Sequence, residues 1–198
     1  MPLPYLRIMP WTSWSREERL FCAVLYEHAR RAPAEFASWL IDNAGLDIST
    51  SGDWELGYEV CLYRDYLWHG RGPTAAKGRF PRKRTFDLCL FGESAIIVIE
   101  AKVCEGFGSK QNESFKNDSK HIANLDGMQH LQVRLVALAS SRYLNRCSKA
   151  TREAFDRWVT WAQVAQKYSD PLLLQADAMY GRKRGELLVD PPAPVAAA

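Results

Sequence analysis

The sequence predicts a single α/β domain, and two patterns in it carry this prediction. Some segments have apolar residues at helical spacing, in others every second residue is apolar, and the two kinds follow one another along the chain. The 198 residues are 47% hydrophobic and 25% charged, which is typical of a globular domain and excludes a disordered or collagen-like chain. We expect the domain to span residues 1–190 and a loose tail of Pro, Ala and Val to follow at 191–198.

Two helices open the predicted domain. Ser15 and Glu18 have the spacing of a capping box and predict a helix that continues to about Ala32. The next segment, Pro33–Asn43, carries apolar residues at helical spacing and predicts a second helix. Gly45 is a suitable C-cap for this helix because glycine adopts the left-handed conformation at little cost.

Three strands are expected next. Residues Glu55–Tyr63 alternate between apolar and polar side chains, as a half-buried strand does. Phe86–Phe91 and Ala95–Val103 are more apolar, and Gly92-Glu93-Ser94 between them suits a tight turn. We therefore expect the last two strands to form an antiparallel hairpin.

The remainder of the chain adds helices and two more strands. Ser109 is expected to cap a helix whose apolar residues recur on one side. Val133–Ala139 fits a helix or a strand by spacing, and its β-branched residues favour a buried strand. Phe155–Val159 predicts a short strand, and Thr160 then caps a last helix that ends at Tyr168.

The sequence points to neither a membrane nor an oxidising compartment. Uninterrupted apolar runs such as Ala95–Ile99 are far shorter than the ~20 residues that cross a bilayer. The N-terminus lacks the apolar stretch of a secretory signal. The five cysteines are odd in number and none has C-x-x-C spacing, so we expect them to be reduced. These features predict a cytoplasmic protein with no membrane partner.

The hairpin is expected to bring three charged residues together. With the turn centred between Glu93 and Ser94, Asp87 lies opposite Glu100, and Lys102 follows on the same face because side chains alternate along a strand. The other face of the hairpin is then apolar and carries Ile97, Ile99, Phe86, Leu88 and Leu90. The alternative is a surface ion pair of Lys102 with one of the acids, which would contribute less than ~1 kcal/mol.

One lysine cannot neutralise two buried carboxylates, and burying each charge costs several kcal/mol unless a cation compensates it. A divalent metal ion would compensate both. Asp87, Glu100 and the backbone carbonyl of Ala101 are hard oxygen ligands, which Mg²⁺ accepts while it keeps several waters. We therefore predict a Mg²⁺ site in which Mn²⁺ can substitute.

Asp87 followed by Glu100-Ala101-Lys102 at the end of the next strand resembles the PD-(D/E)XK nuclease superfamily, and the resemblance covers roughly residues Ser15–Ala139. It implies the restriction-endonuclease-like core of helix, three-strand meander, helix and strand, with the C-terminal helices as additions. It also implies a metal-dependent phosphodiesterase in which the aspartate and the glutamate ligate Mg²⁺ and the lysine positions or activates the attacking water. Phe86 stands where the proline of the superfamily would be.

Four further residues resemble variable additions to the site in that superfamily. Glu18 resembles an acid that many members place near the metal from the first helix, although a capping box also accounts for it. Glu59 on the polar face of the first strand would join the catalytic residues, with an exposed strand glutamate as the alternative. Gln111 is similar to a glutamine that follows the motif in several subfamilies, and Gln129 is the other candidate for that role.

Positive charge gathers between Arg64 and Arg84, where seven Lys and Arg stand against the single acid Asp65. Glycines and prolines in this segment predict a flexible loop. A basic loop suits a phosphate backbone, with a merely solvated loop as the alternative. We expect four of its residues to bind nucleic acid: Arg79, Arg82, Lys83 and Arg84.

Together these features predict a Mg²⁺-dependent nuclease that hydrolyses DNA, in restriction, phage defence or repair. RNA as a substrate, a homodimer and the choice between endonuclease and exonuclease stay open on the sequence alone. Two alternatives are kept. One is an inactive nucleic-acid-binding domain on the same fold, and the other is a protein-interaction module whose tryptophans mark an interface.

Overall fold

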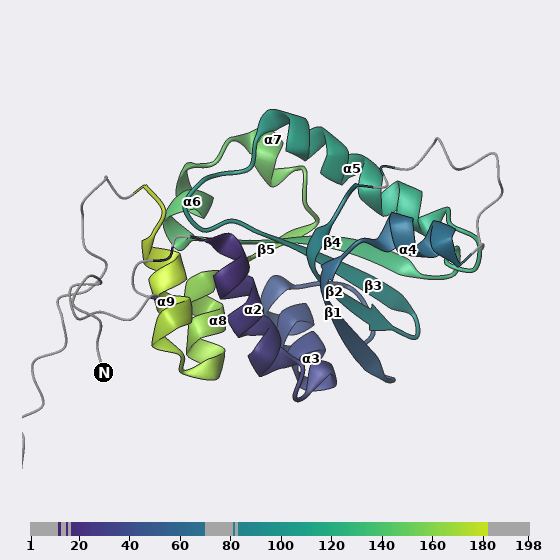
Figure 1. The fold of residues 1–198 in the computed structure, drawn as a ribbon, viewed down its shortest axis with the longest axis horizontal. Helices are drawn as coiled ribbons and strands as arrows, with labels where there is room; N and C mark the ends of the chain where they lie inside the picture. The colour runs from purple at the N-terminus through teal and green to yellow at the C-terminus, as the bar shows by residue number, and fades with distance from the viewer. Residues whose placement is uncertain (1–11, 13–14, 16, 70–80, 82, 182–198) are drawn as a thin grey trace, which may run out of the picture.

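The computed structural model describes residues 12, 15, 17–69, 81 and 83–181. A five-stranded sheet has helices on both faces, so the architecture is mixed α/β as predicted (Figure 1). The strands are β1 (Trp54–Val60), β2 (Phe86–Gly92), β3 (Ala95–Ala101), β4 (Gln132–Ala139) and β5 (Arg157–Thr160). The helices are α2 (Glu18–Ala29), α3 (Pro33–Ala44), α4 (Leu62–Trp68), α5 (Ser109–Ala123), α6 (Ser141–Arg146), α7 (Lys149–Arg152), α8 (Trp161–Tyr168) and α9 (Pro171–Ala178).

The strands lie side by side in chain order, from β1 to β5. The first three form an antiparallel meander, whereas β3 pairs with β4 and β4 with β5 in parallel. A parallel pair needs a crossover connection. Here α5 connects β3 to β4, and α6 with α7 connects β4 to β5.

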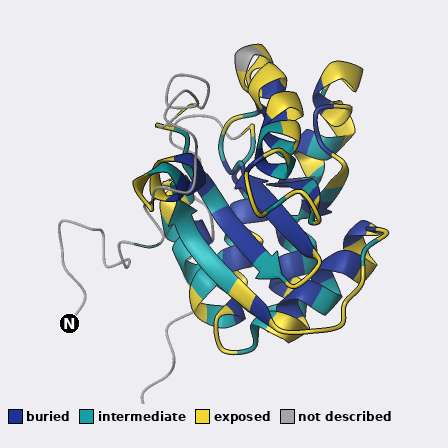
Figure 2. Cartoon of the chain, turned by 90° about the vertical axis from the view of Figure 1, so that its right-hand side faces the viewer, coloured by how far each residue is buried: buried dark blue, intermediate teal, exposed yellow. Residues whose placement is uncertain are grey.

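The sheet separates two apolar clusters. One cluster lies between the sheet and α2, α3, α8 and α9, and the other lies on the opposite face beneath α4, α5 and the α6–α7 segment (Figure 1). Every residue of β3 is buried, which explains why its sequence is an apolar run and not an alternation. Figure 2 shows the buried strands inside the molecule, while β1 at the edge of the sheet is mostly half-buried. Charged residues at the end of β3 are therefore set in a largely apolar interior.

Most of the predicted elements are present. The hairpin of β2 and β3 forms in the predicted register, with Leu88 opposite Ile99. Gly45 ends α3 in the left-handed conformation at a φ of 66°, and Thr160 caps α8 through its side chain. The segment 133–139, which fits helix or strand by spacing, is part of β4.

The prediction that Phe86 shares a face with Leu88 is wrong. Phe86 packs in the cluster beneath α4 and α5, whereas Leu88 packs in the cluster on the other face. The cause lies in β1, where Glu59 has a φ of 52°, a left-handed conformation that interrupts the alternation of a strand. Val60, which follows Glu59 and pairs with Phe86, packs on the α4 and α5 side with it.

Two predicted helix caps are also wrong. α2 begins at Glu18 with Glu17 as its N-cap, and the Ser15 hydroxyl accepts a hydrogen bond from the backbone N–H of Glu17 at 3.2 Å. The side chain of Glu18 does not fold back onto a cap, because it pairs with a lysine of the site described below. α5 is capped one residue earlier than predicted, by Gly108 in place of Ser109.

The segment predicted as a basic loop is helical at its start. α4 covers Leu62–Trp68 and is anchored by the buried side chains of Leu62, Tyr63 and Tyr66. The predicted strand Glu55–Tyr63 was too long, because Leu62 and Tyr63 belong to this helix. Three short helices, α6, α7 and α9, were also absent from the prediction. Most of the basic residues of the segment, including Arg79 and Arg82, lie outside the described residues.

The five cysteines are free, as predicted, and Cys22 and Cys89 are buried. Within the described part of the chain, no helix has both the length and the apolar character that crossing a bilayer requires. The tail predicted at 191–198 lies outside the described residues.

A side-chain contact between distant segments makes one part of the fold sensitive to pH. Asp170 caps α9 through Leu172, and its Oδ2 lies 2.7 Å from Nε2 of His28 at the end of α2. Burial alone would raise the pKa of Asp170, but the hydrogen bonds from His28 and from the backbone of α9 outweigh it and lower this pKa below 3.8. The ionised form is therefore the one that the fold stabilises.

Asp170→Asn should keep the cap and lose the carboxylate charge beside His28. Because the pKa of Asp170 is lowered on folding, its contribution is present above the unfolded pKa of about 3.9 and is lost as the pH falls through the folded value. We expect the variant to be less stable by up to about 1 kcal/mol between pH 5 and 7, and the difference to shrink at pH 3. Urea unfolding at these pH values measures it, with the exposed Asp42→Asn as control. A difference that stays constant from pH 7 to pH 3 would contradict the assignment.

Candidate active site

The candidate site lies where β2 and β3 stop pairing. The last pair of their ladder is Leu88 with Ile99. One residue further on, Oδ2 of Asp87 accepts the backbone N–H of Ala101 at 2.7 Å. A side chain thus takes the place of a ladder hydrogen bond, and Asp87 reaches the Glu100–Lys102 segment through Ala101 and not by facing Glu100 across the ladder.

Glu100 has its partners on the α5 side of the sheet. Its Oε1 accepts a hydrogen bond from Nη2 of Arg84 at 2.8 Å. The same guanidinium donates through Nε to Oδ2 of Asp118 on α5 at 3.0 Å. The hydroxyl of Tyr63 on α4 donates to Oδ1 of Asp118 at 2.8 Å. Glu100 and Asp118 are 5% and 2% exposed, so both carboxylates are held inside the protein.

Lys102 has its side-chain partner on the opposite side, on α2. Its Nζ lies 2.9 Å from Oε1 of Glu18 and 5.5 Å from the centre of the Phe107 ring. Its backbone is held as well, because its N–H donates to the carbonyl of Leu138 and its carbonyl accepts from the indole of Trp161. The prediction placed Lys102 and Glu100 on one face of the hairpin. In the structure their side-chain contacts lie on opposite faces of the sheet, with α2 next to Lys102 and α5 next to the Arg84 partner of Glu100.

Carboxylates outnumber cations in this cluster. Burial raises the pKa of Asp87, although the Ala101 N–H and the charges of Lys102 and Arg84 oppose the rise. Burial also raises the pKa of Glu100 well above 4.5, and it raises the pKa of Glu18. Among the described residues joined by these contacts, four carboxylates meet two cations: Glu18, Asp87, Glu100 and Asp118 with Arg84 and Lys102. When all four carboxyl groups are ionised, they exceed the two cations by two charges, which is the charge of one divalent cation.

Lys102 is a charged group in this site. Burial lowers the pKa of its ammonium, but the nearby carboxylates of Glu18, Asp87 and Glu100 outweigh burial, and the pKa ends above 10.5. The ammonium therefore stays protonated at neutral pH. It can stabilise negative charge or hold a substrate oxygen, and it is not suited to accept a proton.

The other candidate residues have partners outside this cluster. Glu59 pairs with Arg19 at 3.4 Å, and the Gln111 side chain accepts from the backbone N–H of Gly108 at the start of α5. Gln129 accepts from the N–H of the glycine two residues before it. Lys83 is exposed, as a phosphate contact requires, whereas Arg79 and Arg82 lie outside the described residues. The guanidinium of Arg84, which is predicted to bind phosphate, donates to Glu100 and Asp118 in the structure.

Sequence reasoning missed Asp118 and Tyr63 as members of the cluster. Asp118 lies on the same side of α5 as the buried residues Phe115 and Ile122. The sequence did contain a signal for Asp118, since an acidic residue within the apolar stripe of a helix is buried and needs a hydrogen-bond or charged partner. Tyr63 gave no such signal, since the predicted strand placed it on the polar face.

The side-chain oxygens of the site are of the kind that Mg²⁺ accepts as ligands. Within the described residues, no group of three or more His, Cys, Asp and Glu side chains is arranged to hold a metal ion. Mg²⁺ needs fewer protein ligands, because one or two carboxylates hold it while waters and substrate phosphates complete its octahedron. Asp87 and Glu100 supply two carboxylates in a cluster where carboxylates outnumber cations, and carboxylate oxygens are ligands that Mg²⁺ accepts.

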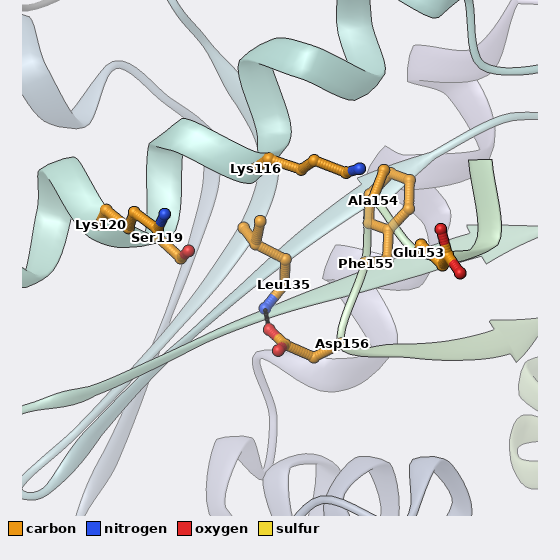
Figure 3. A pocket seen from close by; sticks show the side chains of 8 residues that line it. All are labelled: Lys116, Ser119, Lys120, Leu135, Glu153, Ala154, Phe155 and Asp156. Carbon is orange, nitrogen blue, oxygen red and sulfur yellow. Dashed lines mark hydrogen bonds between the residues drawn. The ribbon is translucent and has the colours of Figure 1, made fainter. Parts of the chain in front are cut away.

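A separate pocket of about 260 Å³ lies against α5 and β4 (Figure 3). Lys116 and Lys120 line it together with Glu153 and Asp156, so its charges are mixed. The Asp156 carboxylate is already engaged by the backbone N–H of Leu135 at 2.7 Å. No residue of the carboxylate cluster lines this pocket.

Neither a family model nor a curated protein matches the chain. The fold and the site are therefore the basis on which its function is inferred.

Proposed function

We propose that the chain is a Mg²⁺-dependent nuclease that hydrolyses phosphodiester bonds of DNA. One observation carries this proposal more than any other. Glu100 is buried and Asp87 half-buried at the point where two strands stop pairing, beside a protonated lysine and in a cluster whose carboxylates outnumber its cations. Buried acids in excess of their cations are costly in a protein with no ligand for them to bind.

The order of the elements also supports the proposal. α2, the meander β1-β2-β3, α5 and the parallel strand β4 follow one another as helix, three strands, helix and strand. This is the order of the restriction-endonuclease-like core that the Asp87 and Glu100-Ala101-Lys102 motif implies. In this reading α4 is an insertion between the first two strands, and β5 with α6–α9 is a C-terminal addition.

In the proposed mechanism each residue has a separate task. Asp87 and Glu100 would hold Mg²⁺, which lowers the pKa of a bound water and polarises the scissile phosphate. Lys102 stabilises the negative charge that develops on the phosphate oxygens in the transition state. Glu18 holds the Lys102 ammonium from α2, which reduces the number of positions the flexible side chain can adopt.

Cleavage assays test the proposal directly. Plasmid DNA, single-stranded DNA and RNA are each incubated with Mg²⁺ or Mn²⁺, and parallel reactions contain EDTA. We expect cleavage of DNA that depends on the metal. Cleavage that persists in EDTA, or no cleavage of any substrate with either metal, would contradict the proposed function.

An inactive nucleic-acid-binding domain is the closest alternative, and metal dependence separates it from the nuclease. A protein-interaction module built on tryptophans has less support. Trp161 and Trp54 belong to the core, at 0% and 6% exposure, and Trp68 is the large exposed tryptophan of the described residues.

The basic segment gives a prediction on affinity. If Arg79, Arg82 and Lys83 neutralise phosphates, replacing all three with Gln should flatten the dependence of log K on log salt by up to about 2.7, at about 0.9 per phosphate on duplex DNA. Binding is measured with Ca²⁺ in place of Mg²⁺ so that cleavage does not disturb the equilibrium. Affinity should fall alike for all sequences, because backbone contacts carry no base information. An unchanged salt dependence would show that this segment is only solvated.

A further inference from the structure

We propose that Arg84 is a positioning residue, which holds the Glu100 carboxylate in place and is itself held by Asp118 and Tyr63. This inference rests on the proposed function, because it concerns the orientation of a proposed metal ligand. The sequence predicted that Arg84 binds phosphate, whereas its contacts in the structure favour the role of holding Glu100.

The Arg84 guanidinium is fixed both at its donors and on its faces. Nη2 donates to Glu100 and Nε donates to Asp118, so two nitrogens of one planar group serve two carboxylates. The guanidinium carbon lies 5.1 Å from the centre of the Phe86 ring and 4.5 Å from that of Phe115. Only 17% of the side chain is exposed. Any rotation of the guanidinium therefore breaks a hydrogen bond or a ring contact.

The support behind Arg84 comes from two helices. Tyr63 on α4 is fully buried, and its hydroxyl donates to the same Asp118 carboxylate that accepts from Arg84. Asp118 belongs to α5, so the chain of contacts from Tyr63 to Glu100 joins α4, α5 and the end of β3. A satisfied polar network in a protein interior restricts the positions of its members. Glu100 is thereby held from the α5 side of the sheet.

A phosphate contact by Arg84 would dismantle this arrangement. Turning the guanidinium to DNA would leave Glu100 and Asp118 buried without their cation, which is strongly unfavourable. Holding Glu100, in contrast, is compatible with metal binding. An ionised carboxylate has about four lone-pair sites on its two oxygens, so one hydrogen bond from Arg84 leaves acceptor capacity for an ion.

A double-mutant cycle tests the contact without metal or DNA. Arg84→Gln, Glu100→Gln and the double variant are unfolded in urea with EDTA present. We expect the two single changes to be coupled by at least about tenfold in the unfolding equilibrium constant, as for neighbours in one buried network. Arg30 and Glu27 form a matched control, because their guanidinium–carboxylate distance is also 2.8 Å and both side chains are about half exposed. Their coupling should stay below about fivefold.

Kinetics then test whether the contact serves the site. We expect Arg84→Gln to lower kcat by about 10–100-fold, the usual effect of losing a residue that orients a metal ligand. Its Kd for DNA in Ca²⁺ should stay at the wild-type value, because Arg84 contacts no phosphate. Arg84→Lys should recover only part of kcat, since an ammonium lacks the planar fork. Tyr63→Phe removes the hydroxyl that donates to Asp118 and should lower kcat by a smaller factor, whereas Arg30→Gln should match the wild type.

Several outcomes would overturn the inference while the proposed function stands. One is that the effects of Arg84→Gln and Glu100→Gln on stability are additive, and another is that Arg84→Gln has the kcat of the wild type or loses only affinity for DNA. Full recovery of kcat by Arg84→Lys would show that Arg84 acts through its charge alone. If Arg84→Gln does not fold, Arg84→Lys and Tyr63→Phe supply the same comparison. If the wild type neither cuts DNA nor binds Mn²⁺ while the cycle still shows coupling, the proposed function falls and the inference with it.

Discussion

Asp87→Asn and Glu100→Gln are each expected to abolish metal-dependent cleavage, with losses of roughly 10²–10³-fold or more, as when a single group that stabilises transition-state charge is removed. Each variant keeps the shape of the side chain and loses a charged metal ligand. Asn at position 87 can still accept the backbone N–H of Ala101, so the end of the hairpin should stay intact. The loss of cleavage should therefore result from weaker metal binding and not from unfolding of the protein.

Two measurements separate these causes. Calorimetric titration with Mn²⁺ should show lost or strongly weakened binding in both variants. Urea unfolding in EDTA should show Asp87→Asn as stable as the wild type or more stable, because the substitution relieves repulsion between buried carboxylates. Asp156→Asn is the matched control, since that carboxylate also accepts a strand N–H at 2.7 Å but lies outside the cluster. Wild-type Mn²⁺ binding in either site variant would remove that residue from the site.

Lys102→Ala should reduce turnover far more than metal affinity. The raised pKa keeps Lys102 charged, so its substitution removes a positive charge from the position where negative charge develops on the phosphate. We expect kcat to fall by about 10²-fold or more. The Kd for Mn²⁺ should not weaken, because Lys102 competes with the ion for negative charge and does not ligate it. Single-turnover rates at saturating DNA measure the effect on the chemical step.

Lys102→Arg should restore little of this loss. A guanidinium keeps the charge but replaces a compact ammonium by a planar group, which the contacts with Glu18 and the Phe107 ring do not accommodate in the same place. Lys167→Ala is the control, because the Lys167 ammonium also lies about 5.5 Å from an aromatic ring, that of Trp39, and has no part in the proposed site. An unaltered single-turnover rate in Lys102→Ala would remove the role assigned to this lysine.

The sequence predicted the elements that depend on local patterns. The hairpin register follows from two apolar segments joined by a short turn, so Asp87 and the Glu100–Lys102 segment could be brought together without a structure. The prediction failed where a local pattern was interrupted. Glu59 adopts a left-handed conformation inside a strand that reads as regular, and Phe86 consequently packs on the unexpected face.

The charged residues at the end of the hairpin can be found from the sequence, because they are neighbours along two adjacent strands. Which partner each charge meets depends on the packing of the whole fold. Glu18 and Lys102 are separated by 84 positions. Arg84 and its two partners, Glu100 and Asp118, belong to three different segments of the chain. These pairs depend on how helices pack on the two faces of the sheet, which no local pattern encodes. Burial then forces the pairing, since a charge inside the protein is stable only beside an opposite charge or hydrogen-bond partners.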